Sequence, residues 1–278
     1  MPKFEVSTTK SFKKMNALKI TTVLFFILIS QFANAQFEDK FYFPKKEWRE
    51  VKVSYSEEFI PVGNDTIHTV FFKAAIAPKA TVLFFHGAGG NISTYMYMIR
   101  PLLENGYQVY AVDFRGYGKS THINIKEDVA VVYSKMKAHQ EIKDTKLIVM
   151  GASLGCQIAT YLANDKQNEV AALVLDGGFA SFADVAKLYA PKEAHTFIEK
   201  ALGSVYPSKE EIKEIENMPK LIIHGKIDAS IPMNQSEMVF KNAKEPKSFF
   251  VSEKGHLDAL KFETKKVIKE IDKLLTIQ

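Results

Sequence analysis

The stretch Leu147-Ile-Val-Met150-Gly151-Ala-Ser153-Leu-Gly155 decides the fold of this chain. Its first four residues form a short apolar run, which is typical of a strand buried on both faces of a sheet. A serine follows, with glycines two positions away on either side, and a helical pattern begins directly after it. A serine on so sharp a strand-to-helix turn needs a strained backbone, and the glycines let strand and helix approach closely. We expect the Ser153 hydroxyl to stand above the sheet, facing the amide dipoles of the helix.

Short apolar runs alternate with amphipathic segments on both sides of this turn. The strand candidates are residues 81–85, 108–112, 146–150, 171–175, 221–223 and 248–251. The helix candidates between and after them are residues 96–105, 126–139, 154–164, 233–242 and 262–275. This alternation predicts an α/β fold with a doubly wound, mostly parallel sheet and helices on both faces. Two alternating segments, 51–60 and 67–75, flank Pro61-Val-Gly-Asn-Asp65 and predict an antiparallel hairpin before the parallel strands.

One interval, from Ser181 to Pro219, contains no strand candidate. It holds helical patterns at 182–189 and 194–202 and an acidic stretch at 209–216. We expect an insertion of about residues 182–218 to form a small helical cap over the carboxyl ends of the strands. A plain surface excursion is the alternative that the sequence leaves open.

The positive charge of the chain is concentrated at its start. The first 35 residues hold five lysines against Glu5, a net charge of +4 out of +5 for the whole chain. An apolar run of 11 residues, 20–30, and the small residues Ala33 and Ala35 complete the pattern of a secretory signal peptide. The run is shorter than the roughly 20 residues of a membrane-spanning helix.

We therefore predict that residues 1–35 are a signal peptide cleaved after Ala35. The product is a secreted or periplasmic domain of residues 36–278 with no stable transmembrane segment. Met15 is an alternative start that gives a more compact signal, and an uncleaved chain would be anchored in the membrane.

The composition excludes several other classes of protein. The chain is 46% hydrophobic and 25% charged, which argues against disorder. A single cysteine forms no intramolecular disulfide, and no His, Cys and carboxylate cluster has metal-ligand spacing, so we expect neither metal nor cofactor. Beyond residue 35 the charge is nearly balanced and no basic stripe is interleaved with aromatic residues, so we expect no nucleic-acid partner. The oligomeric state is left open.

The loop His86-Gly-Ala-Gly-Gly-Asn91 follows the first parallel strand candidate. Together with the Ser153 turn it resembles the α/β-hydrolase superfamily, over nearly all of the chain after residue 35. The resemblance implies that two backbone N–H groups, those of Ala88 and Leu154, form an oxyanion hole, with Gly89 as the alternative to Ala88. The turn at 113–120 is similar to a family turn that is structural, so we expect no catalytic role for it.

Two later loops supply the other residues that the resemblance implies. The loop 221–232, which contains Asp228, is similar to the family's acid loop, and Lys254-Gly-His256-Leu257 is similar to the loop of its catalytic histidine. The order Ser153, Asp228, His256 is that of the superfamily. Asp176 is the alternative acid, because some family members place their acid after the preceding strand.

Four other residues are weaker candidates. His195 and His224 are rivals of His256 as the base, whereas His86 precedes the nucleophile and is expected to order its loop. Cys156 lies three positions beyond the turn apex, so we expect it to be a small buried residue.

These residues describe a serine hydrolase, most simply a carboxylic ester hydrolase, that forms an acyl-enzyme on Ser153. Its substrate is a small acyl ester, or a thioester or amide. The compact cap and the sequence 176–185 resemble the branch of small serine hydrolases that contains membrane-associated lipid hydrolases and protein-depalmitoylating enzymes. One alternative is an aminopeptidase-like serine peptidase, which needs an acidic group in the cap such as Glu193 or Glu199. The other is a secreted binding module without catalytic activity.

Overall fold

The computed structural model describes residues 41–74, 76–121 and 126–277. The predicted signal peptide, its cleavage after Ala35 and the alternative start at Met15 lie outside these residues. The chain divides into two compact units, and the sheet and its helices belong to the second unit, residues 44–278. Within the described part of the chain, no helix combines the length and apolar character needed to cross a membrane.

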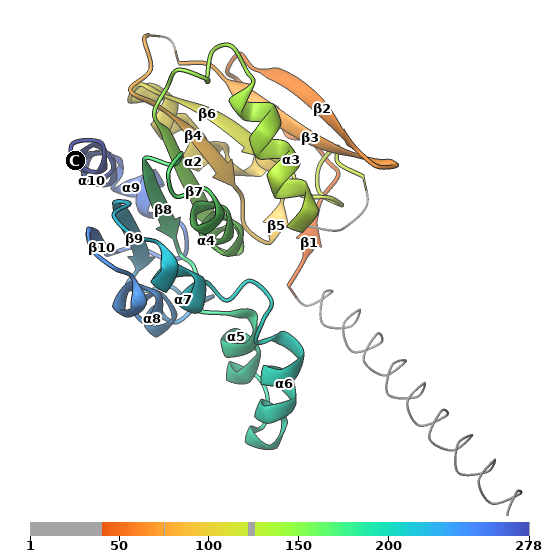
Figure 1. Ribbon diagram of the computed structural model, residues 1–278, viewed down its shortest axis with the longest axis vertical. Coiled ribbons are helices and arrows are strands. Elements are labelled where there is room, and N and C mark those ends of the chain that lie inside the picture. Colours follow the sequence, from red (N-terminus) through yellow and green to blue (C-terminus); the bar gives the residue numbers. More distant parts are fainter. Residues whose placement is uncertain (1–40, 75, 122–125, 278) are drawn as a thin grey trace, which may run out of the picture. The chain divides into compact units, whose positions relative to one another are not determined.

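An eight-stranded sheet forms the centre of the second unit, in the order β10-β9-β8-β7-β4-β6-β3-β2 (Figure 1). The strands from β10 to β6 run parallel, whereas β3 is antiparallel to β6 and β2 is antiparallel to β3. The bounds are β2 (Ser56–Val62), β3 (Asp65–Phe72), β4 (Ala80–Phe85), β6 (Tyr107–Val112), β7 (Leu147–Ala152), β8 (Ala172–Asp176), β9 (Lys220–Gly225) and β10 (Lys247–Ser252); β1 (Phe43–Pro44) and β5 (Gly89–Gly90) are short. The predicted mostly parallel sheet is confirmed.

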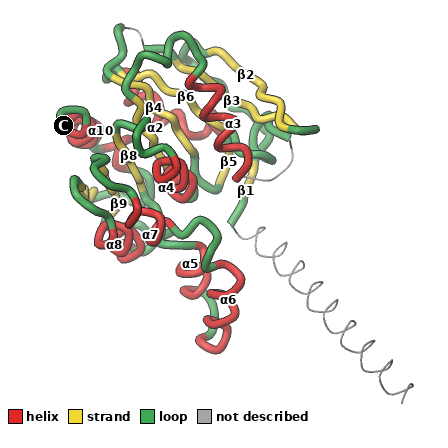
Figure 2. Tube along the Cα trace, in the orientation of Figure 1, coloured by secondary structure: helices red, strands yellow, loops and turns green. Residues whose placement is uncertain are grey.

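Helices cover both faces of this sheet, as predicted (Figure 2). One face carries α2 (Met96–Glu104), α9 (Ala259–Phe262) and α10 (Thr264–Leu274), and the other carries α3 (Lys126–Lys137), α4 (Gly155–Asp165), α7 (Ser208–Glu211) and α8 (Met233–Asn242). The remaining elements are α5 (Phe182–Leu188), α6 (His195–Leu202) and the short 3₁₀ helices η1 (Ile92–Tyr95), η2 (Lys192–Ala194) and η3 (Ile212–Glu214).

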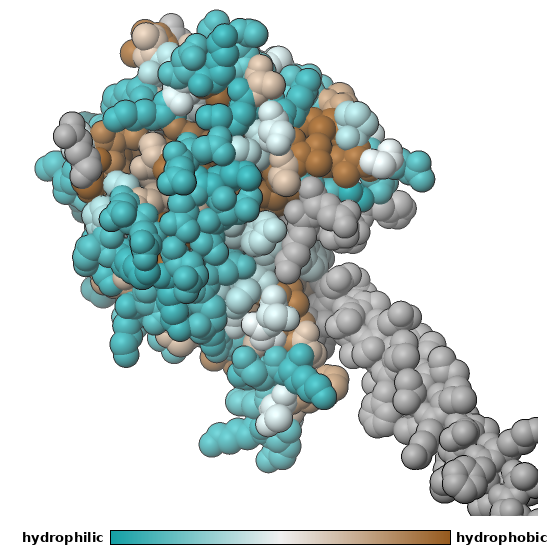
Figure 3. All heavy atoms as spheres, in the orientation of Figure 1, coloured by the Kyte–Doolittle hydropathy of each residue, from teal (hydrophilic) through white to brown (hydrophobic). Residues whose placement is uncertain are grey.

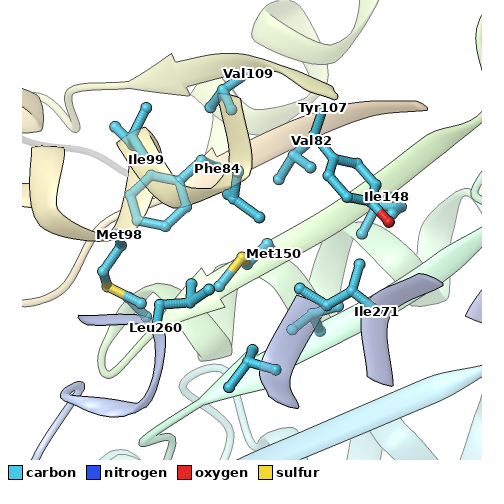
Figure 4. Close-up of a cluster of buried hydrophobic side chains, with 14 of the residues drawn as sticks. Val82, Phe84, Met98, Ile99, Tyr107, Val109, Ile148, Met150, Leu260 and Ile271 are labelled. Carbon is cyan, nitrogen blue, oxygen red and sulfur yellow. The ribbon is translucent and has the colours of Figure 1, made fainter. Parts of the chain in front are cut away.

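The core on the α2 and α10 face shows why these segments adopt their elements. Alternate side chains of the central strands point toward it, because successive side chains of a strand face opposite sides of a sheet. Figure 4 shows these strand side chains packed against side chains of the helices. The strands contribute Val82, Phe84, Tyr107, Val109, Ile148 and Met150, and the helices α2, α9 and α10 contribute Met98, Ile99, Leu260 and Ile271. The intervening residues of β4 are buried as well, so the strands that carry the site have both faces covered.

Two predicted elements differ from the observed ones. The hairpin turn consists only of Gly63 and Asn64, and the first strand begins at Ser56, not at residue 51. The residues before Ser56 do not pair with β3. Among them, Val51 and Val53 pack their side chains against the core. The predicted helix 262–275 is divided at Glu263 into α9 and α10.

The helical interval between β8 and β9 has two parts. Helix α7 and η3 pack against α4, and both also contact α8. Helices α5 and α6 contact each other and project away from the sheet in Figures 1 and 2. Among the helices that the structure describes, this pair stands apart, and its role as a cap stays a prediction.

Candidate active site

The order of the strands determines where a ligand has room to bind. Strands β4 and β7 are neighbours, with Phe85 opposite Gly151, but the chain leaves β4 toward β6 on one side and leaves β7 toward β8 on the other. In open α/β sheets a crevice forms at such a switch point, outside the carboxyl ends of the strands. The Ser153 turn follows β7 and the glycine loop follows β4, so both lie at this switch point.

Ser153 occupies the strained turn that the sequence predicts. Its φ is +51°, in the left-handed region that non-glycine residues rarely adopt. Its N–H donates to the carbonyl oxygen of Asp176 at 2.8 Å, and its own carbonyl oxygen accepts from the N–H of Cys156 at 2.9 Å. A Cβ atom on Gly155 would overlap the carbonyl oxygen of Phe85. The absence of a side chain there therefore lets α4 begin directly against β4.

His256 and Asp228 form a hydrogen-bonded pair above the ends of β10 and β9. The Nδ1 atom of His256 lies 2.6 Å from Oδ2 of Asp228, whose side chain is 1% exposed. The other oxygen, Oδ1, accepts from the N–H of Ser230 at 2.8 Å and of Ile231 at 2.9 Å. Burial opposes ionisation of Asp228, but the hydrogen bonds from His256 and Ile231 outweigh it and hold its pKa below the ordinary value.

A single short loop after β8 joins this pair to the serine. The carbonyl oxygen of Asp176 holds the N–H of Ser153. The next residue is Gly177, whose φ is +63°, and a Cβ atom on it would lie 3.1 Å from Cε1 of His256. The structure thus brings Ser153, His256 and Asp228 to the same end of the sheet.

Asp176, the alternative acid, is 1% exposed and lies in the same region. Among the described residues its Oδ2 atom has no hydrogen-bond partner. Burial raises the pKa of Asp176 to about 7, with the charge of His256 opposing the rise and those of Asp228 and Asp258 adding to it. The hydrogen-bonding geometry therefore favours Asp228 as the partner of His256.

The glycine loop presents the backbone groups expected to form the oxyanion hole. Among the residues that the structure describes, the N–H groups of Ala88 and Leu154 donate to no protein acceptor. The hydroxyl of Tyr117 donates to the carbonyl oxygen of Ala88 at 2.8 Å, which fixes the orientation of that peptide. In the described part of the chain, no acceptor therefore competes with a ligand for either N–H group.

Buried polar residues hold this loop in place. Asp113 accepts from the N–H of Ile92 at 2.8 Å and contacts Nδ1 of His68 at 2.8 Å. His86 is fully buried, and its Nδ1 lies 2.7 Å from the carbonyl oxygen of Gly87. These contacts fit the expectation that His86 orders the loop and that the turn beginning at Asp113 is structural.

Ring nitrogens of both rival bases contact other groups of the fold, and the cysteine is buried. His224 is fully buried, and its ring nitrogens contact the Ser236 hydroxyl at 2.8 Å and the Ile231 carbonyl oxygen at 2.9 Å. His195 lies on α6, with its Nε2 3.2 Å from the carbonyl oxygen of Ala190. Cys156 is buried as predicted, and burial raises the pKa of its thiol well above the ordinary value.

The acidic groups that an aminopeptidase requires are not enclosed. Glu193 is exposed, and Glu199 is 50% exposed and paired with Lys187. No three His, Cys, Asp or Glu side chains in the described part of the chain are gathered as a metal site would require.

Tyr95 is the residue at this site that the sequence did not identify. Its side chain lies against Gly87 and the Ser153 turn, and no short motif marks it, because its position depends on how η1 packs.

Comparisons with known proteins agree with this architecture. Residues 80–202 match a family described as having the alpha/beta hydrolase fold. The esterase Pf2001 of Pyrococcus furiosus is similar in structure, with a TM-score of 0.65 at 18% identity over 84% of this chain and 98% of its own. The chain therefore has the α/β-hydrolase fold.

Two curated relatives are similar in sequence. The uncharacterized protein YfhR of Escherichia coli strain K12 is 28% identical over 232 residues, which is 80% of this chain and 78% of that protein. Protein bem46 of Schizosaccharomyces pombe is 28% identical over 167 residues, which is 58% of this chain and 56% of its own.

Proposed function

We propose that this hydrolase cleaves a carboxylic ester, or a related thioester or amide, through an acyl-enzyme on Ser153. The observation that supports the proposal is that Ser153, on its strained turn, lies at the same end of the sheet as the 2.6 Å pair of His256 and Asp228. The same arrangement of nucleophile, base and acid occurs on unrelated folds that perform acyl transfer.

The chemistry follows from the geometry of the pair. Asp228 accepts the Nδ1 proton of His256, which leaves Nε2 free to take the hydroxyl proton of Ser153 as its Oγ bonds to the substrate carbonyl carbon. The N–H groups of Ala88 and Leu154 stabilise the resulting oxyanion. Collapse of this adduct breaks the ester bond, and the leaving alcohol takes the proton from His256. Water then attacks the acyl-enzyme in the same way, releasing the acid and restoring Ser153.

Covalent labelling with a fluorophosphonate probe tests this proposal. We expect the folded wild-type chain to be labelled and Ser153→Ala to be unlabelled, because the serine hydroxyl forms the bond to phosphorus. Cys156→Ala is the matched control, three residues away and buried, and should label like the wild type. A folded wild-type chain that stays unlabelled would favour the non-catalytic binding module.

The choice between ester and amide substrates needs a rate series. We propose an ester, because neither Glu193 nor Glu199 is enclosed to hold a substrate amine. Nitrophenyl esters of increasing chain length should be hydrolysed faster than an aminoacyl nitroanilide. The opposite order would support the peptidase alternative.

We also propose export by an N-terminal signal peptide. The mature chain purified from the expressing cells should begin at Gln36. Amino-terminal sequencing checks this, and an intact amino-terminal segment on a membrane-bound chain would indicate an uncleaved anchor.

A further inference from the structure

The hydroxyl of Tyr95 lies beside the nucleophile, across a glycine. A Cβ atom on Gly87 would lie 2.6 Å from Oη of Tyr95 and 3.2 Å from Cβ of Ser153. The phenol oxygen and Cβ of Ser153 therefore both lie close to the position that a side chain on residue 87 would occupy. The next residue is Ala88, whose N–H is one of the two expected oxyanion donors.

The position of Tyr95 is fixed by the surrounding loop. The side chain of Asn91 caps η1, accepting from the N–H of Ser93 at 3.0 Å, and donates to the carbonyl oxygens of Lys45 and Glu47. The ring of Tyr95 stacks on that of His86, with centroids 5.4 Å apart and an interplanar angle of 26°. Tyr95 is 7% exposed, so its hydroxyl is held in place before substrate arrives.

The protonation state of Tyr95 suits a hydrogen-bond donor. Burial raises the pKa of Tyr95 to about 12, although the backbone N–H groups of Gly87 and Gly89 face its oxygen and oppose the rise. The phenol thus keeps its proton at neutral and mildly alkaline pH. Because the amides face the lone pairs of the oxygen, the hydroxyl proton is left for another acceptor.

We propose that Tyr95 donates a third hydrogen bond to the oxyanion formed on Ser153, beside the N–H groups of Ala88 and Leu154. This inference rests on the proposed hydrolase function. Tyr95 keeps its proton throughout, while the proton of Ser153 moves to His256. The interaction strengthens as the carbonyl oxygen gains negative charge, so it lowers the barrier of the chemical step more than it strengthens substrate binding.

The replacement Tyr95→Phe removes the hydroxyl and keeps the stacked ring. With a nitrophenyl butyrate substrate we expect kcat to fall about 10- to 100-fold, at or below the roughly 10²–10³-fold loss seen when a side-chain oxyanion donor is removed from a comparable site, while KM changes less than about twofold. Affinity for a trifluoromethyl ketone, which forms a tetrahedral adduct with the serine, should fall by a similar factor. Tyr97→Phe is the matched control, because its ring stacks on Tyr95 with centroids 6.0 Å apart. Its kcat should stay within about twofold of the wild type.

The outcomes separate this inference from the proposed function. A folded wild-type chain without hydrolysis or fluorophosphonate labelling overturns both. If the wild type is labelled and active, two results overturn the role of Tyr95 alone. In the first, Tyr95→Phe has the same kcat as the wild type; in the second, Tyr97→Phe loses as much kcat as Tyr95→Phe.

A second variant covers the case in which Tyr95→Phe does not fold. Site-specific replacement of Tyr95 by 3,5-difluorotyrosine keeps the ring and the hydroxyl but makes the phenol more acidic. We expect activity to be lost at lower pH than in the wild type, because an ionised phenol no longer donates. An unchanged alkaline limb of the kcat profile would contradict the donor role, since a purely structural side chain would not move it.

Discussion

The chemistry of single residues here depends on which carboxylate His256 contacts. Asp228 and Asp176 lie at the same end of the sheet, but only Asp228 is 2.6 Å from Nδ1 of His256. Asp228 also has two backbone donors on its other oxygen, which hold it ionised and in place. The two carboxylates therefore have different roles to be tested, although Asp176 ends β8 and Asp228 lies in the loop directly after β9.

Replacing Asp228 by Asn should nearly abolish turnover. An amide in place of the carboxylate favours the wrong tautomer of His256, and the equivalent change in a comparable triad lowers kcat by about 10⁴-fold. Asp176→Asn is the matched control and should keep kcat within about tenfold, because Asp176 does not bond to His256. Steady-state kinetics with a nitrophenyl ester measure both variants. The reverse ranking would assign the acid to Asp176.

The burial of Asp176 makes stability depend on pH. When folding raises the pKa of a carboxyl group, the protonated group stabilises the native state at pH values below the pKa of the unfolded chain. This stabilisation is lost as the pH rises through the pKa in the folded state, which for Asp176 is about 7. Asp176→Asn removes this loss. Its free energy of unfolding, relative to the wild type, should rise between pH 4 and pH 7 by up to about 4 kcal/mol. Urea unfolding at pH 4.5 and pH 8 measures it, and a difference independent of pH would contradict the shift.

At the scale of elements, the sequence predicted the strands that carry the site. The run before Ser153 is β7, and the strand before the glycine loop is β4, because apolar runs of this length are buried on both faces. The start of β2 was not predictable, since Val51 and Val53 alternate like strand residues but find core contacts without a partner strand.

The remaining features of the site depend on tertiary packing. The resemblance to the α/β-hydrolase superfamily pointed to Ser153, Asp228 and His256, and the structure places all three at one end of the sheet. Nothing in the sequence around Tyr95 indicates that its hydroxyl lies against Gly87, because η1 and the β4 loop must first pack. Likewise, the sequence placed Asp176 after a strand, but its raised pKa follows from burial by distant segments.

The start of α4 should be the element least tolerant of an added methyl group. A Cβ atom on Gly155 would overlap the carbonyl oxygens of Phe85 and His86, and backbone atoms of a central strand cannot move aside cheaply. Gly155→Ala should destabilise the fold by about 1–3 kcal/mol and displace the Ser153 turn, reducing labelling. Thermal unfolding and fluorophosphonate labelling check both effects.

Gly89→Ala is the control for this change. A Cβ atom on Gly89 would meet no atom within 4 Å, so stability should change by less than about 0.5 kcal/mol. Equal destabilisation by the two variants would show that the close approach of α4 to β4 does not limit stability.

At the scale of the whole chain, burial is unevenly distributed. The strands beneath the site, β4 and β7, are buried along their whole length. Helices α5 and α6 stand apart from them, and the large apolar side chains near their ends remain exposed: Leu188 at 45%, Tyr189 at 77% and Phe197 at 58%. In Figure 3 the visible face over α7 and α8 is largely hydrophilic, in contrast to these exposed apolar side chains.

This difference predicts that the α5–α6 pair opens independently of the site. The free energy of local opening falls where few buried residues hold a segment. In α6 only Ile198 and Leu202 are buried, so its amides should exchange with solvent orders of magnitude faster than those of β4 and β7, with α5 between them because four of its seven residues are buried. Hydrogen–deuterium exchange followed by mass spectrometry measures both.

Helix α4 is the internal control, since eight of its eleven residues are buried, and its exchange should be slow. If opening of α5 and α6 exposed α4 and the Ser153 turn at the same rate, the pair would be part of the structural core. Slow exchange at the turn with fast exchange in the pair would instead show that these helices open while the nucleophile stays in place.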